Sequence, residues 1–201
     1  MLRPTFADFP NDRRCYVEND EMMLGASLLV APAVEEGQTE RAVYLPDGAR
    51  WVSYWSGEAF EGGQTVTQPA PWDQPVMLVR EGGVIALNVA EQHFDQRADQ
   101  RGFLVVPMRG VGEATGGCLE DDGETEAWRH GEQGRWNVRA VSDEQTIALH
   151  VSREGRMPVH ADTVEIFLPA SDARQVQTPQ ARIVDSVDAG GWRRLTLQLL
   201  A

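Results

Sequence analysis

The chain of 201 residues is long enough for one large domain or two small ones, and its 42% hydrophobic and 24% charged residues are typical of a globular protein. Its formal net charge of −13 argues against nucleic acid and anionic membrane as partners, because both require a basic surface. No apolar run reaches the length of a membrane span, so we expect a soluble protein, with the bacterial cytoplasm as the expected compartment.

The first 24 residues differ in pattern from the rest of the chain. A polar turn at Pro10-Asn11-Asp12 precedes a segment, 19–24, that predicts a short helix. Asn19 or Asp20 would cap the free N–H groups of that helix, and Gly25 suits its C-terminus. We therefore expect a strand and a helix ahead of the main fold.

From Ser27 onward the hydrophobic pattern changes to a period of two, with Gly, Pro, Asp and Asn between short runs, which is typical of β-sandwich strands. The Gly82-Gly83 pair predicts a hairpin between the last two runs. We assign residues 25–95 to a proximal β-sandwich. Its expected strands are Leu28–Ala31, Arg41–Leu45, Trp51–Trp55, Gln64–Gln68, Pro75–Arg80 and Val84–Leu87.

A polar segment, 88–101, predicts a linker, and a second series of strands follows it. We assign residues 96–201 to a distal β-sandwich, so that the predicted fold is mostly β, with two consecutive antiparallel β-sandwich domains. Alternation places Trp136, Val138 and Ala140 on one strand face. The other expected strands are Phe103–Pro107, Thr146–Val151, Val164–Leu168, Arg182–Val184 and Leu195–Leu199.

Residues that could carry catalysis or bind a metal are scattered. The four histidines form no metal-ligand pair, and no nucleophile elbow or phosphate loop is present. Cys15 and Cys118 are best interpreted as reduced thiols. The acidic segment 120–126 favours a turn over a Ca²⁺ site, and catalysis is less favoured than either. We predict no catalytic residue, no metal ligand and no cofactor.

An aromatic cluster is the remaining candidate for a binding site. Apolar residues on both faces of the strand that begins at Trp51 indicate that neighbours cover both faces, so core or interface packing is the favoured interpretation. The alternative is a carbohydrate platform, with Trp55 and Trp72 as the candidate residues, because sugar rings stack on exposed aromatic faces. The cluster consists of Trp51, Tyr54, Trp55, Phe60 and Trp72.

Taken in order, several short motifs resemble the C-terminal third of glycoside hydrolase family 31, the α-glucosidase and α-xylosidase family. The resemblance is specific up to about Ile85 and looser beyond it, where only the acidic turn supports it. The motifs are Arg3-Pro4-Thr5-Phe6-Ala7-Asp8-Phe9-Pro10, Leu24-Gly25-Ala26-Ser27-Leu28-Leu29-Val30-Ala31-Pro32, Tyr44-Leu45-Pro46, Trp51, Trp55-Ser56-Gly57, Gly62-Gly63, Ala70-Pro71, Pro75-Val76-Met77-Leu78-Val79-Arg80-Glu81-Gly82 and Glu120-Asp121-Asp122-Gly123.

This resemblance implies that residues 1–24 are the end of a (β/α)8 catalytic barrel and that the rest supports that barrel. The family uses two Asp residues for retaining hydrolysis. Their contexts, W-x-D-x-N-E and a later G-D, are not found here, so the chain alone is expected to be inactive. The expected partner is the barrel of the same enzyme, with oligosaccharide binding and homo-oligomerisation left open.

Two alternatives to this supporting role remain: a carbohydrate-binding module, and a structural subunit that assembles with a separately encoded barrel. Leu2, Phe6 and Phe9 would contact the barrel, and without it we expect them to be exposed. In the chain alone, the N-terminal segment should then be disordered, self-associated or docked on the first sandwich.

Overall fold

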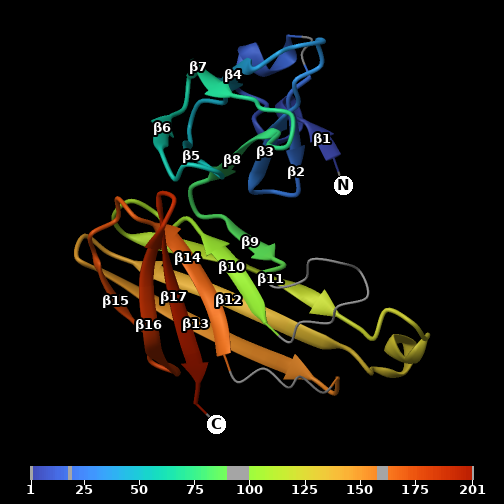
Figure 1. The fold of residues 1–201 in the computed structure, drawn as a ribbon, viewed down its shortest axis with the longest axis vertical. Coiled ribbons are helices and arrows are strands. Elements are labelled where there is room, and N and C mark those ends of the chain that lie inside the picture. Colours follow the sequence, from blue (N-terminus) through green and yellow to red (C-terminus); the bar gives the residue numbers. More distant parts are fainter. Residues whose placement is uncertain (1, 18–19, 90–99, 158–162, 201) are drawn as a thin grey trace. The chain divides into compact units, whose positions relative to one another are not determined.

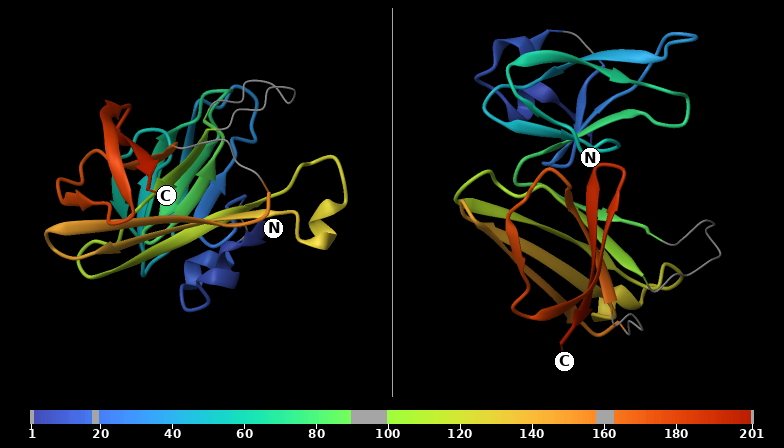
Figure 2. Two further views of the ribbon diagram at one scale, coloured as in Figure 1. Left: turned by 90° about the horizontal axis from the view of Figure 1, so that it is seen from below. Right: turned by 60° about the vertical axis from the view of Figure 1, so that its left-hand side comes forward.

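The computed structural model describes residues 2–17, 20–89, 100–157 and 163–200 of the chain (Figure 1). The fold is mostly β, as predicted, and the helical elements within the described residues are short. The chain divides into two compact units, residues 1–83 and 84–201, and further views of the strands are given in Figure 2.

The first unit contains a six-stranded antiparallel sheet with the order β1-β2-β3-β8-β5-β6, and β4 and β7 form a separate antiparallel pair. Helix α1 and the 3-10 helix η1 lie between β1 and β2 in sequence. The element bounds are β1 (Leu2–Pro4), α1 (Thr5–Asp8), η1 (Arg13–Tyr16), β2 (Met22–Leu24), β3 (Leu28–Ala31), β4 (Glu40–Leu45), β5 (Arg50–Ser53), β6 (Ala59–Glu61), β7 (Gln64–Pro69) and β8 (Val76–Arg80).

Trp51 lies in the core of this unit. Its side chain is fully buried, and its indole N–H donates a hydrogen bond to the carbonyl of Pro46 at 3.1 Å, so the polar atom of the ring is satisfied. Val52, on the opposite face of β5, is also buried. The prediction that this strand is covered on both faces is therefore confirmed.

The second unit is a sandwich of a five-stranded sheet, β16-β17-β14-β10-β9, and a four-stranded sheet, β11-β12-β13-β15. Most pairs are antiparallel, but β10–β14 and β13–β15 are parallel. The element bounds are β9 (Val84–Leu87), β10 (Arg101–Val105), β11 (Gly112–Glu120), η2 (Ala127–His130), β12 (Gly134–Ser142), β13 (Thr146–Gly155), β14 (Thr163–Pro169), β15 (Gln175–Gln177), β16 (Ala181–Ala189) and β17 (Trp192–Leu199).

The core of the second unit lies between the two sheets. Trp136, Val138 and Ala140 are all buried on one face of β12, as the alternation predicts. Trp136 meets Phe103 of the facing sheet, with the ring centroids 6.2 Å apart. Large aromatic side chains from both layers therefore fill the middle of the sandwich.

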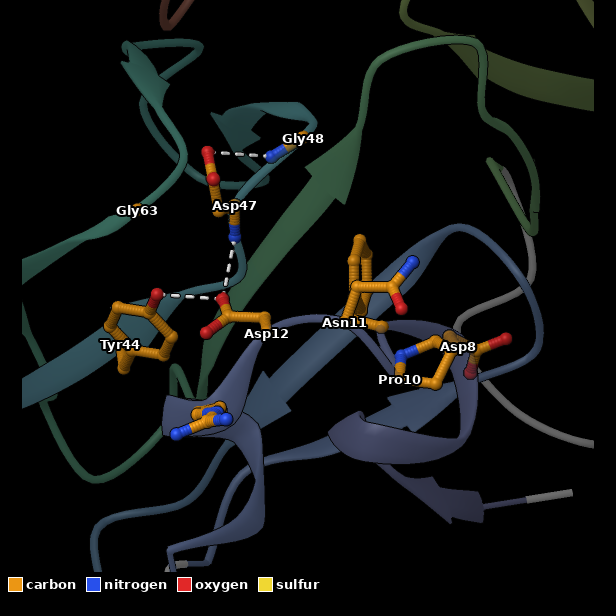
Figure 3. Close-up of a pocket in the computed structure, with 10 residues that line it drawn as sticks. Asp8, Pro10, Asn11, Asp12, Tyr44, Asp47, Gly48 and Gly63 are labelled. Carbon is orange, nitrogen blue, oxygen red and sulfur yellow. Dashed lines mark hydrogen bonds between the residues drawn. The ribbon is translucent and has the colours of Figure 1, made fainter.

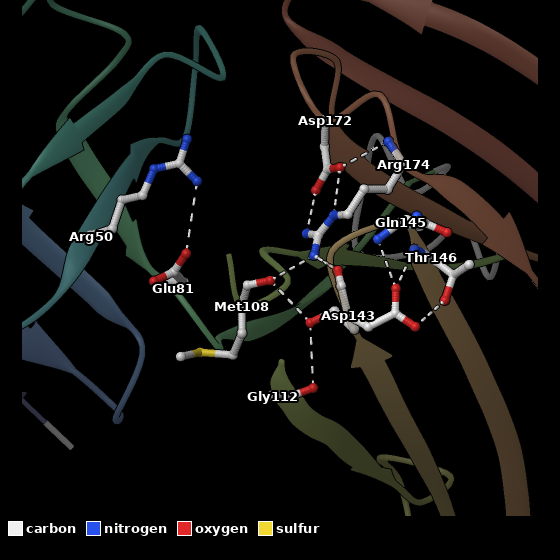
Figure 4. A network of polar contacts seen from close by, with 10 residues as sticks. Arg50, Glu81, Met108, Gly112, Asp143, Gln145, Thr146, Asp172 and Arg174 are labelled. Atoms are coloured by element: carbon white, nitrogen blue, oxygen red, sulfur yellow. Dashed lines mark hydrogen bonds and ion pairs between the residues drawn. The ribbon is translucent and has the colours of Figure 1, made fainter. Parts of the chain in front are cut away.

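Polar contacts fasten the loops at one end of this unit (Figure 4). Arg174 forms a two-pronged ion pair with Asp172 and also donates to the carbonyls of Met108 and Asp143 at 2.9 Å. Burial opposes ionisation of Asp172, but the contacts with Arg174 prevail and lower the pKa of that carboxyl. One guanidinium thus connects the loop before β15 to the loops around β11 and β13.

The segment predicted as a helix before Gly25 is a strand. Residues Met22–Leu24 form β2, which pairs with β1 on one side and β3 on the other, and Met23 is completely buried. The apolar run gains more by completing a sheet than the local capping signals favour in a helix, so tertiary pairing overrides them. Asn19 lies outside the described residues.

The predicted hairpin between β8 and β9 is also wrong. Strand β9 pairs with β10, while β8 is flanked on both sides by β3 and β5 and has no free edge. Residues 81–83 therefore connect the two compact units. The pairing assigns β9 to the second unit, although the sequence pattern counted it with the proximal sandwich.

The glycine pair Gly116-Gly117 lies inside β11 rather than in a turn. Gly117 is opposite Asn137, and a Cβ atom at Gly117 would lie 1.9 Å from the carbonyl oxygen of Trp136. The missing side chain therefore permits the close approach of β12. Periodicity missed this strand because its glycines interrupt the apolar alternation.

The close approach at Gly117 yields the first testable prediction. Gly117→Ala should destabilise the second unit by about 2–3 kcal/mol, because the methyl group overlaps backbone atoms that cannot move independently. Gly123→Ala is the control: its site is open, with φ +66°, so only backbone strain of about 1 kcal/mol applies. Urea unfolding measures both, and equal losses would contradict the steric explanation.

Candidate functional site

The N-terminal segment 2–24 is fastened to β4 through Tyr44 (Figure 3). One carboxylate oxygen of Asp12 accepts hydrogen bonds from the Tyr44 hydroxyl at 2.6 Å and from the Asp47 N–H at 2.9 Å. The other accepts from the Arg14 N–H at 3.0 Å and so caps η1. Asp12 therefore connects η1 both to β4 and to the turn that follows β4.

The electrostatics of Asp12 follow from these contacts. Burial opposes its ionisation, but hydrogen bonds from the Asp47 amide, the Tyr44 hydroxyl and the Arg14 amide together lower the pKa of the carboxyl. In the opposite sense, burial and the bond to Asp12 raise the pKa of Tyr44. The pair is therefore held as a carboxylate and a neutral phenol.

Glu21 holds the other end of Tyr44. Its buried carboxylate accepts a hydrogen bond from the Tyr44 backbone N–H at 2.7 Å. Burial raises the pKa of Glu21, and the charges of Arg41 and Arg14 partly offset this effect. The guanidinium of Arg14 also lies over the Tyr44 ring, 4.1 Å from its centroid. The two carboxylates thus fix the segment on both sides of one residue.

A hollow of about 460 Å³ opens beside this joint. Its acidic side chains already have partners, since Asp8 pairs with Arg3 at 2.8 Å, Asp47 accepts from the Gly48 N–H at 2.8 Å, and Asp12 holds Tyr44. These contacts give the acidic side chains that line the hollow structural roles. The lining residues are Asp8, Phe9, Pro10, Asn11, Asp12, Arg13, Tyr44, Asp47, Gly48 and Gly63.

An exposed apolar surface lies on the same N-terminal segment, and we call it the N-terminal apolar surface. Leu2 pairs directly with Leu24 across β1 and β2, and the rings of Phe6 and Tyr16 stack with centroids 5.2 Å apart. Its members are large side chains that are each at least 40% exposed: Leu2, Phe6, Tyr16, Val17 and Leu24.

The segment is docked on the first sandwich, which is one of the three outcomes expected from the sequence. Leu2 and Phe6 are exposed, as predicted. Phe9 is not: it is buried, its ring lies 5.7 Å from that of Trp51, and the guanidinium of Arg80 lies over it at 4.8 Å. The expectation for Phe9 was wrong because this ring belongs to the core of the unit.

The two tryptophans predicted as carbohydrate candidates lie on turns of the first unit. Trp55 follows β5 and is 39% exposed, and its indole N–H donates to the Pro75 carbonyl at 2.7 Å. Trp72 lies in the turn before β8 and is fully exposed. The structure therefore places both near the start of β8, whereas Trp51 of the same sequence cluster is core.

The acidic segment 120–126 forms hydrogen-bonded turns. Asp122 accepts from the backbone N–H groups of Glu124 and Thr125 and from the Thr125 hydroxyl, and Asp121 accepts from the Gly123 N–H. These bonds support the turn interpretation. Within the described ranges, no group of three or more His, Cys, Asp and Glu residues is placed to hold a metal ion.

Both cysteines are free thiols. Cys15 is buried in the first unit, and burial raises its pKa to about 11, while Cys118 lies partly buried in β11 of the second unit. An elevated pKa leaves little thiolate at neutral pH, so the Cys15 thiol is unreactive and its side chain serves to pack the core. His93 and His160 lie outside the described residues.

Comparison with known proteins identifies the family. Residues 1–85 match the glycosyl hydrolase family 31 C-terminal domain. Residues 1–85 therefore belong to glycosyl hydrolase family 31. The chain is 30% identical over 155 residues to alpha-glucosidase 2 of Bacillus thermoamyloliquefaciens, which covers 77% of this chain and 19% of that protein. It is 32% identical over 100 residues to an alpha-xylosidase of Saccharolobus solfataricus, which covers 47% of this chain and 14% of that protein.

The fold of this chain is also found in solved structures. A GH31 dextranase from Flavobacterium johnsoniae aligns with a TM-score of 0.79 at 21% identity, over 98% of this chain and 27% of the dextranase. At that identity the match concerns the fold. The chain spans about a fifth or less of the two curated relatives named above. Among the described residues, no helix is long and apolar enough to cross a membrane.

The Asp12–Tyr44 bond yields a pH-dependent prediction. Asp12→Asn should lower the free energy of unfolding at neutral pH by about 1–3 kcal/mol, because an amide NH₂ replaces one of two accepting oxygens and leaves a donor unpaired. The folded pKa of Asp12 is lowered, so its contribution is complete above the unfolded pKa of about 3.9 and is lost as the pH falls through the folded value.

Urea unfolding of both proteins across the acidic range measures this difference. It should be constant near neutral pH and shrink in acid. Tyr44→Phe is the matched control, since it removes one hydroxyl and should be additive with Asp12→Asn only if the two side chains do not interact. A pH-independent difference, or full additivity, would show that the bond does not stabilise the protein.

Proposed function

We propose that this chain forms the non-catalytic C-terminal β-domains of a retaining α-glycosidase that acts on α-glucosides or α-xylosides. The N-terminal apolar surface would pack against the catalytic barrel of the same enzyme. The domain match over residues 1–85 and the names of the two relatives support the enzyme class. The bond breaking itself would belong to the barrel, which would supply the nucleophile and the acid/base.

The main support for this proposal is the apolar surface, which is exposed although hydrogen bonds fix the segment that bears it. Leu2, Phe6 and Leu24 are each more than 40% exposed, although the segment around them is fixed by buried hydrogen bonds. Exposed apolar side chains that lie side by side are characteristic of a surface that another domain covers, and here Leu2 lies beside Leu24 and Phe6 stacks on Tyr16. A segment fixed by Asp12 and Glu21 would hold that surface in position without folding on contact.

The first consequence concerns activity. The purified chain should show no turnover of aryl α-glucoside or aryl α-xyloside above the uncatalysed rate, because neither of the two carboxylates required by the family is expected here. Release of the aryl group at neutral pH is the measurement. Turnover that one substitution in this chain abolishes would refute the non-catalytic assignment.

The second consequence concerns the apolar surface. Phe6→Asp with Leu24→Asp should reduce binding of an apolar fluorescent dye and reduce any self-association, because the two changes place charge on the surface that we expect to be covered. Circular dichroism checks that the fold persists. Dye fluorescence and light scattering are the readouts.

Val187→Asp provides a matched control, since Val187 is a 41% exposed apolar residue on β16 of the second unit. It should leave dye binding nearly unchanged. If Val187→Asp reduced dye binding as much as the double variant does, the N-terminal apolar surface would not be the main exposed apolar site.

A further inference from the structure

Two tryptophans of the first unit stand apart from both its core and its N-terminal apolar surface. Trp72 is fully exposed, and Trp55 is 39% exposed. Outside the N-terminal apolar surface, the other large exposed apolar side chain described in this unit is Val34, which is 59% exposed and lies between β3 and β4 in sequence.

The ring of Trp55 is held in one orientation. Its N–H donates to the Pro75 carbonyl at 2.7 Å, and the Tyr54 ring meets it edge-on, with centroids 5.0 Å apart and planes at 81°. The Tyr54 backbone N–H in turn donates to the Met77 carbonyl at 2.9 Å. A ring that is fixed before binding loses little conformational entropy when a ligand covers it.

Trp72 lies close to the same position. Three peptide units separate it from Pro75, and three units span at most about 11 Å, so the two indoles belong to one small area at the start of β8. The turn that carries Trp72 is closed by a hydrogen bond of 3.0 Å from the Gln74 N–H to the Pro71 carbonyl. Both rings are therefore presented by defined turns.

The polar side chains of these two turns indicate what kind of molecule the rings would bind. Ser56 and Glu58 follow Trp55 in the sequence, and Asp73 and Gln74 follow Trp72. These groups accept and donate hydrogen bonds to hydroxyl groups, while their two carboxylates repel an anion. The turns 54–58 and 71–75 contain no basic residue.

We propose that Trp55 and Trp72 form a binding platform for a neutral oligosaccharide, separate from the surface that the barrel would cover. The apolar C–H face of a pyranose ring carries a slight positive charge, and it stacks on the negative face of an indole ring. The surrounding carboxylates and amides then accept and donate hydrogen bonds to the hydroxyls at the ring edge. A chain of linked hexoses supplies two such faces in succession.

Titration of the whole chain with maltotetraose tests the platform, with the indole N–H signals observed by nuclear magnetic resonance. The signals of Trp55 and Trp72 should shift, and Trp72→Ala should weaken binding about tenfold. Because Trp72 is fully exposed, its replacement leaves the fold intact even if Trp55→Ala does not. An oligogalacturonate of equal length should bind much more weakly, because its carboxylates meet Glu58 and Asp73.

Trp128→Ala is the matched control, since Trp128 is 46% exposed in the second unit, with its own Arg129 guanidinium 5.3 Å from the ring centroid. It should bind maltotetraose like the parent chain. Absence of shifts at saturating sugar, equal affinity for oligogalacturonate, or unchanged affinity of Trp72→Ala would each overturn the proposal. So would a Trp72→Ala variant that binds the sugar normally but loses binding to a family 31 barrel, because the rings would then belong to the domain interface.

Discussion

Tyr44 is the residue on which the arrangement of the first unit depends. Its hydroxyl is held by Asp12, its backbone N–H by Glu21, and its ring by the guanidinium of Arg14. Two of these partners, Asp12 and Arg14, lie in the loop and 3-10 helix after α1, and the third, Glu21, precedes β2. One residue therefore contacts three points of a segment that has little regular structure of its own. Without these contacts, short elements such as β1 and α1 would have too few hydrogen bonds to persist.

That fastening explains how an exposed apolar surface can be ordered. Met23 and Phe9 bury one side of the segment in the core, while Leu2, Phe6 and Leu24 remain on its outer side. The segment thus has apolar side chains on both sides, with the core of the first unit against one side and the N-terminal apolar surface on the other. The supporting function that we propose rests on this division, with the barrel packed against Leu2 and Phe6.

Much of the fold could be predicted from the sequence because period-two alternation is strong in both sandwiches. Strands β3 and β4 are close to their expected bounds, and Trp136, Val138 and Ala140 of β12 face the core as alternation requires. The errors have physical causes. Met22–Leu24 carries helix-like capping signals but completes a sheet, and β9 follows a turn-like sequence but pairs with β10, because β8 has no free edge. Pairing partners of this kind are set by tertiary contacts that local sequence does not encode.

The candidate site was less predictable. The sequence singled out Trp55 and Trp72 from the aromatic cluster as carbohydrate candidates, and the structure exposes these two side chains while it buries Trp51. It also missed Asp12 and Glu21, since their partner, Tyr44, is more than 20 residues away in each case. A carboxylate just before a short helical segment signals a cap, but no local pattern indicates that the same carboxylate also receives a distant tyrosine hydroxyl.

We propose that the N-terminal segment is a preformed surface for a family 31 barrel. Calorimetric titration of such a barrel, produced without its own C-terminal domain, into this chain tests it most directly. We expect a saturable one-to-one complex with a negative heat-capacity change from apolar burial, and we expect the Phe6→Asp and Leu24→Asp variant not to form it. Absence of binding, or binding that the variant retains unchanged, would contradict it.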